Sequence, residues 1–91
     1  MSIKKIDNDP TEELEKAFGQ VLRKARMEKD LSQQDLAYTC GLGRAFISLL
    51  ERGMRAPSLR TFLILAHSMG VSAVEFLTTV EEALRRHRNS S

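Results

Sequence analysis

The chain has little of the chemistry that supports disulfides, metal sites or membrane insertion. Its one cysteine, Cys40, cannot form an internal disulfide, and with only His67 and His87 beside it there is no ligand set for a structural metal. No apolar run approaches the roughly 18 residues that a membrane span requires, and the first residues lack the apolar stretch of a secretory signal. We therefore expect no cofactor, no metal, no membrane association and a cytoplasmic location.

Net charge is also low, at +2, but its distribution along the chain is uneven. Residues 23–60 carry eight Lys or Arg against four Asp or Glu, whereas residues 1–22 carry three against five and residues 61–91 three against three. The 91 residues suffice for one domain with a modest core, and 29% charged and 42% hydrophobic residues are typical of a soluble globular chain. A solvated basic face is the simplest interpretation of the basic middle third, unless it coincides with a nucleic-acid-binding geometry.

Apolar residues recur at helical spacing in the first half of the chain, with boundary signals between the segments. The first predicted helix begins at Pro10, with Asp9 as its cap. A second follows a capping box, in which Ser32 is paired with Asp35 three residues on, and runs to about Cys40. A third helix is predicted over residues 44–52, ended by a glycine.

Two more helices are predicted in the second half. Ser58 caps a fourth helix that runs to about Met69, and Ser72 with Glu75 opens a fifth that runs to about His87. The apolar stripe of the fourth comprises Leu59, Phe62, Leu63, Ala66 and Met69. No strand pattern competes. We predict an all-α, compact five-helix domain over residues 10–88 with an extended C-terminal helix, a flexible arm over residues 1–9 and a disordered tail over residues 89–91.

The segment 33–52 is the most informative, because its two short helices meet across a turn too short for them to lie antiparallel. They must therefore cross steeply. Ala37 is small enough for close helix approach, and Gly41 permits a left-handed turn. The residues expected to face inward are Leu36, Cys40, Leu42, Ile47 and Leu50. This is the pattern of a helix-turn-helix unit.

Several short segments carry a resemblance to a known family. They are residues 22–26 (LRKAR), 31–37 (LSQQDLA), 47–48 (IS), 50–53 (LERG), 57–59 (PSL) and 69–72 (MGVS). Over about residues 18–77 the chain resembles the lambda-repressor-like, or Cro/C1-type (XRE), helix-turn-helix regulators. In length and in lacking an effector domain it is also similar to restriction-modification controller proteins. The resemblance implies a dimeric transcriptional regulator, a repressor or controller, whose third helix enters the DNA major groove.

We expect the outward residues of that third helix to contact the DNA bases. Arg44 matches the two major-groove acceptors of guanine, although a solvent or phosphate contact is the alternative. Ser48 is a further base-reading candidate. Ala45 and Leu49 suit thymine methyl groups, with local packing an equal explanation for Leu49. Phe46 lies either at the edge of the DNA surface or, by preference, in the core.

Phosphate contacts are expected around the same helices. Gln33 can donate through its side-chain amide while the neighbouring backbone N–H groups do the same, as the resemblance also implies. The other backbone-contacting candidates are Gly43, Arg52, Arg55 and Arg23, with Arg60 a further one. Gly43 departs from the family, since Ser or Thr often caps the recognition helix there. Together with the apolar Leu49, this departure leaves the recognised base sequence open.

The resemblance implies one structural pair and one assembly. Arg26 and Glu51 correspond to positions that form a partly buried ion pair between the first helix and the end of the third. One domain contacts one half-site, so affinity requires a homodimer on a palindromic operator. We expect the dimer interface to contain Val74, Phe76, Val80 and Leu84, with the alternative that some of these complete the monomer core.

Two other function classes compete with DNA binding. A protein-binding module, such as an antitoxin or anti-repressor, would use Leu49, Phe46 and Met54 as an apolar partner surface. An enzyme is not expected, because His67 has no nucleophile or carboxylate near it in the sequence pattern and Cys40 faces inward. No small-molecule effector is expected either. We predict sequence-specific binding of double-stranded DNA.

Overall fold

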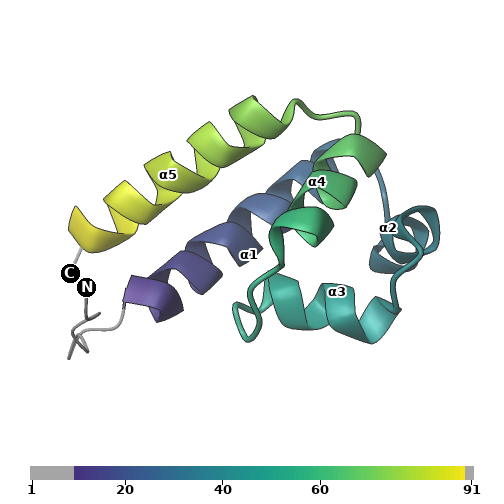
Figure 1. Cartoon of the computed structure of the whole chain (residues 1–91), viewed down its shortest axis with the longest axis horizontal. Helices are drawn as coiled ribbons and strands as arrows, with labels where there is room; N and C mark the ends of the chain where they lie inside the picture. The colour runs from purple at the N-terminus through teal and green to yellow at the C-terminus, as the bar shows by residue number, and fades with distance from the viewer. Residues whose placement is uncertain (1–9, 90–91) are drawn as a thin grey trace.

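The computed structural model describes residues 10–89, and within that range the chain forms five helices and no strand (Figure 1). They are α1 (Pro10–Glu28), α2 (Gln33–Cys40), α3 (Arg44–Glu51), α4 (Leu59–Ser68) and α5 (Ala73–Asn89). The all-α prediction is confirmed. The predicted arm over residues 1–9 lies outside the described residues, as do residues 90 and 91. The predicted tail is wrong at Asn89, which is the last residue of α5.

Three of the predicted caps, at Ser32, Ser58 and Ser72, set helix boundaries, and the predicted cap Asp9 lies outside the described residues. At the start of α2 the Asp35 N–H donates to Ser32 Oγ at 2.9 Å, and the Ser32 N–H donates to the Asp35 carboxylate at 3.0 Å. Ser58 Oγ accepts from the Thr61 N–H at the start of α4, and Ser72 caps α5 in the same way. These side chains satisfy backbone donors that have no partner inside the helix, which is why each helix begins where it does.

The two long helices form one side of the molecule. In Figure 1, α1 and α5 lie side by side and run in opposite directions, so the start of α1 and the end of α5 meet at one end. Arg88 Nε lies 3.3 Å from Glu13 Oε2 at that end. The short helices α2, α3 and α4 gather at the other end, where α3 packs on α1 and α2, and α4 packs on α2 and α5.

Three phenylalanines join the long helices to α4. Phe76 of α5 stacks on Phe18 of α1 and on Phe62 of α4, with ring centroids 5.6 and 5.0 Å apart. The rest of the core is aliphatic and continues between α1, α2, α3 and α4. Its buried members are Ala17, Val21, Leu22, Leu36, Ala37, Ile47, Leu50, Leu65, Ala66, Met69, Val80 and Ala83. One continuous core thus holds the short helices against α1 and α5.

Two assignments made from periodicity are wrong in α4. Leu59 and Leu63 were expected to face inward, but they are 75% and 47% exposed, whereas Leu65 is fully buried. The inward stripe of α4 is spaced by three and four residues, at Phe62, Leu65, Ala66 and Met69, and Leu63 falls to one side of it. Leu59 is the first residue of the helix, and it lines an apolar hollow together with Leu77 and Val80.

The expected dimer interface is also corrected. Phe76 and Val80 are buried inside the monomer, at 2% and 3% exposure, so neither can meet a partner. Leu84 packs partly against the same core. Val74 is 75% exposed and remains available, and Leu77 beside it on α5 is 52% exposed. The side of α5 that faces Phe18 and Phe62 completes the core, Leu77 lies at the edge of that side, and Val74 is exposed away from it.

Between residues 10 and 89, no single helix combines the length and apolar character needed to cross a membrane. Helices α4 and α5 pass that test only when they are taken together, across a bend of 110°.

Candidate nucleic-acid interface

The turn between α2 and α3 is built by a glycine and two backbone hydrogen bonds. Gly41 adopts the left-handed conformation, with φ 70° and ψ 28°, which a side chain disfavours. The Gly41 N–H donates to Tyr38 O and the Leu42 N–H to Ala37 O, which closes the end of α2. Gly43 then extends the chain into α3. Figure 1 shows α2 nearly end-on while α3 lies across the view, so the two helices cross steeply.

This crossing presents the start of α3 to solvent. Arg44 and Ala45 are exposed, and Ser48 and Leu49 are half-buried. Phe46 is half-buried and packs against the core, which is the position that the sequence favoured for it. The inner side of α3 is held by Ile47 and Leu50, both fully buried. The Arg44 side chain is therefore carried by a rigid support and does not enter the protein interior.

The basic candidates for phosphate contact lie around α3. Arg52 follows the helix directly, and its Nε lies 3.4 Å from Ser48 O, so its side chain folds back along the outer face. Arg55 is exposed in the loop between α3 and α4. Arg23 is exposed on α1, one helical turn from Gly19 and from Arg26. Both of those residues touch the end of α3, which places Arg23 on the flank of α1 next to it.

Arg26 and Glu51 come together as the family resemblance implied. Arg26 Nε donates to one carboxylate oxygen of Glu51 and Nη2 to the other, the latter at 3.0 Å. The side chains are only 12% and 4% exposed. The hydrogen bond to Glu51 raises the pKa of the Arg26 guanidinium above its usual value, and burial opposes this with a smaller effect. A fork of this kind fixes α1 to the last residue of α3.

The structure adds two partners to that pair which sequence reasoning missed. Arg26 Nη1 donates to Leu31 O at 2.7 Å, in the turn that precedes α2. Gln33 Nε2 donates to Glu51 Oε1 at 3.1 Å. The amide that was expected to meet a phosphate is therefore already hydrogen-bonded within the protein. Nothing in the local sequence signals this bond, because the two residues are eighteen positions apart.

A close backbone contact also positions α3, and sequence reasoning missed it too. A Cβ atom at Gly19, inside α1, would lie 2.5 Å from Leu50 O and 2.6 Å from Glu51 O. At Gly53, where φ is 72°, it would lie 2.9 Å from Lys16 Cα. The end of α3 thus rests directly on the α1 backbone. A glycine within an otherwise good helical pattern was the available signal for such a contact.

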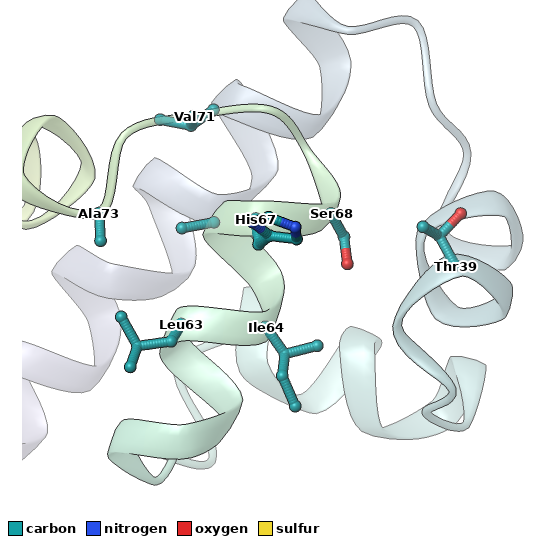
Figure 2. A pocket seen from close by; sticks show the side chains of 8 residues that line it. Thr39, Leu63, Ile64, His67, Ser68, Val71 and Ala73 are labelled. Atoms are coloured by element: carbon teal, nitrogen blue, oxygen red, sulfur yellow. The ribbon is translucent and has the colours of Figure 1, made fainter.

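A shallow hollow of about 550 Å³ lies between α2 and α4 (Figure 2), and none of the candidate DNA-contacting residues lines it. Leu63, Ile64, His67 and Ser68 of α4 line it, and Figure 2 shows Thr39 of α2 on its far side. Its lining includes an imidazole and hydroxyls but no carboxylate. In the part of the chain that the structure describes, no group of three or more His, Cys, Asp or Glu is arranged to hold a metal ion.

Comparison with known proteins adds three observations. Residues 22–76 match the family HTH_3, described as helix-turn-helix. Over 70 residues the chain is 36% identical to the HTH-type transcriptional regulator y4dJ of Sinorhizobium fredii, covering 77% of this chain and 91% of that protein. Over 61 residues it is 39% identical to the control protein C.BamHI of Bacillus amyloliquefaciens, covering 66% of this chain and 75% of that protein.

Among solved structures, the chain is similar to the restriction-modification controller protein C.Esp1396I, crystallised as a tetramer with its natural 35-base-pair operator. The TM-score is 0.72 and the sequence identity 31%, over 78% of this chain and 93% of that one.

Proposed function

The chain belongs to the helix-turn-helix family of transcriptional regulators, and from this membership and the geometry of α3 we propose that it binds duplex DNA sequence-specifically as a homodimer. Helix α3 enters the major groove, and binding at an operator regulates transcription. The observation that carries the proposal is the exposed start of α3, with Arg44 and Ala45 facing solvent above a fully buried inner side. The chain acts as a DNA-binding protein of the cytoplasm, without catalysis or a small-molecule effector.

Arg44 reads a guanine in this proposal. It stands at the first position of α3, where a guanidinium can reach O6 and N7 of one guanine with two hydrogen bonds. Ala45 contacts a thymine methyl group, and Ser48 binds a base edge one turn further on. Leu49 is half-buried, so only part of its side chain is available to a thymine methyl group.

Phosphate contacts flank the reading helix. Gln33 at the start of α2 and the Gly43 N–H before α3 donate to the DNA backbone, and the space where a Cβ atom at Gly43 would lie is open. Arg52, Arg55 and Arg23 are exposed around the end of α3 and supply the positive charge. Because such contacts release counterions from DNA, binding must weaken as salt rises.

The dimer uses the exposed surface of α5 around Val74 and Leu77, with the adjoining edge of α4. Val74 and Leu77 are exposed on α5. Leu63 of α4 is also exposed, and it borders the same hollow as Ala73 in the first turn of α5. An apolar surface of this kind, continuous across two helices, is suited to a twofold contact with a second copy. Leu84 lies further along α5 and joins the interface only through its exposed part.

The rival use of this fold as a protein-binding module is not favoured. It required Phe46 as part of an apolar partner surface, but Phe46 packs against the protein's own core.

The test is selection of bound sequences from a random pool of duplex DNA. We expect a twofold-symmetric motif, and Arg44→Ala should relax the preference at one position in each half-site, with a loss of roughly tenfold to hundredfold. Arg55→Ala should weaken binding to all sequences and lower the slope of log affinity against log salt by about 1. Arg86→Ala serves as the matched control, because this exposed arginine lies on another side of α5 from Val74 and Leu77. Absence of salt-dependent duplex binding by the unmodified protein would refute the proposal.

The assembly is tested separately by sedimentation. A Val74→Glu variant places a charge on this surface at a side chain that is 75% exposed, and it should shift the protein from dimer to monomer without lowering its thermal stability as a monomer. If the unmodified protein sediments as a monomer well above micromolar concentration, the proposed dimer does not exist.

A further inference from the structure

The Gln33 side chain is held in place within the protein itself. Its Nε2 donates to Glu51 Oε1 at 3.1 Å, across the gap between the start of α2 and the end of α3. The same oxygen accepts from Arg26 Nη2 at 3.0 Å, and the second oxygen accepts from Arg26 Nε. Both Glu51 oxygens are therefore occupied by donors, and the carboxylate is buried, with 4% of its side chain exposed.

A carboxylate in this position determines which way round the glutamine amide sits. Ionised Glu51 is an acceptor only, so it can bind the NH2 group of Gln33 but not its carbonyl oxygen. If the amide were flipped, the carbonyl oxygen of Gln33 would face the carboxylate oxygen of Glu51, and neither atom could donate a hydrogen. One N–H of the amide is used by Glu51, and the second N–H is left to donate elsewhere.

We propose that Glu51 is a positioning residue for DNA binding: it orients the Gln33 amide so that the remaining N–H donates to a phosphate at the start of α2. This inference rests on the proposed function, and it identifies the residue that orients one of the side chains proposed to contact a phosphate. Because Gln33 is oriented before DNA arrives, less side-chain freedom is lost on binding.

The Glu51 carboxylate can orient Gln33 because Arg26 holds it in place. Two nitrogens of the Arg26 guanidinium donate to the Glu51 carboxylate. The third donates to Leu31 O at 2.7 Å, two residues before Gln33. Arg26 also offsets the negative charge of Glu51, which would otherwise repel a nearby phosphate. One network therefore joins α1, the turn before α2, the start of α2 and the end of α3, and it couples the stability of the fold to a DNA contact.

The test is a double-mutant cycle on the full-length protein, with Gln33→Ala, Glu51→Gln and both changes together. The probe is a duplex selected by the unmodified protein, and affinity is measured at one salt concentration and at a temperature where every variant is folded. Gln33→Ala should cost roughly tenfold for each half-site, as expected for a lost hydrogen bond to a charged group. Gln34→Ala, the exposed neighbour, is the matched control and should bind as the unmodified protein does.

The cycle separates positioning from a general effect on the fold. Glu51→Gln should weaken binding in the unmodified background but cause no further loss in the Gln33→Ala background. Its melting temperature should fall in both backgrounds, because the pairing with Arg26 is weakened either way. An equal loss of affinity in both backgrounds would overturn the inference, and so would unchanged affinity of Glu51→Gln.

A second measurement needs no DNA. In nuclear magnetic resonance spectra of the free protein, the side-chain NH2 of Gln33 should show slowed solvent exchange, and this should disappear in Glu51→Asp, which keeps the charge but withdraws the carboxylate by one methylene. Fast exchange in the unmodified protein would overturn the inference even if DNA binding is found. If the NH2 is protected but no duplex is bound, the proposed function fails instead, and the role of Glu51 in DNA binding fails with it.

Discussion

Replacing Gly19 with alanine tests how α3 is held against α1. The added methyl group would lie 2.5 Å from Leu50 O and 2.6 Å from Glu51 O. Both atoms belong to backbone, so no flexible side chain can move aside. Restoring an ordinary contact distance of 3.4 Å requires the end of α3 to retreat by about 0.9 Å.

Two opposing effects set the size of the change in stability. Alanine is favoured over glycine inside a helix by about 1 kcal/mol. Overpacking a close-packed contact costs about 1–3 kcal/mol, and a clash with two carbonyl oxygens belongs at the upper end of that range. We therefore expect Gly19→Ala to lower the free energy of unfolding by about 2 kcal/mol. For a domain of this size the melting temperature should fall by roughly 10 °C.

Circular dichroism during thermal and urea unfolding measures this effect. Gln20→Ala, an exposed substitution at the next position of α1, is the control and should change stability by no more than about 0.5 kcal/mol. DNA affinity should also fall for Gly19→Ala at temperatures where it is folded, because α3 carries Arg44. A variant as stable as the unmodified protein would show that α1 and α3 do not approach each other as described, and the position of the reading helix would have to be revised.

Two further predictions concern single charges. Arg26→Ala leaves the buried Glu51 carboxylate without its partner and should cost about 3 kcal/mol in urea unfolding; stability retained while only DNA affinity is lost would contradict the structural role of the pair. For Asp35, hydrogen bonds from Ser32 hold the pKa of the carboxyl below its usual 3.8, the backbone N–H contributing most. The Asp35 carboxylate of the folded protein therefore resists protonation. Its contribution to the free energy of unfolding is complete only well above the usual pKa of 3.8, and it is lost as the pH falls through the lower folded value. Unfolding between pH 2 and 6 should show a shallower loss for Asp35→Asn, and parallel curves would exclude the effect.

Local signals in the sequence were sufficient for the helices of this chain. Ser32, Ser58 and Ser72 accept hydrogen bonds within four residues of themselves, so each cap is a property of a short segment. Gly41 likewise ends α2 through its own backbone conformation. The steep turn between α2 and α3, and with it the exposure of Arg44, follows from these local choices. The identity of the Arg26 and Glu51 pair came from the family resemblance.

Contacts between distant segments could not be predicted in the same way. Helical spacing marks several apolar positions, but which of them is covered depends on the neighbour that packs there. For that reason helical spacing predicts Leu63 inside and Phe76 at an interface, while the structure exposes the first and buries the second. The contact of Gly19 with α3 has the same origin, since it exists only when two helices are brought together.

The amino-acid sequence alone therefore determined the five helices, their caps and the exposed start of α3, because each depends on hydrogen bonds and backbone angles within a few residues. Only the tertiary structure decided how closely α3 lies on α1 and that Glu51 holds the amide of Gln33. Those features depend on distances of a few ångströms between residues far apart in the chain, and such distances are set by the packing of the whole core.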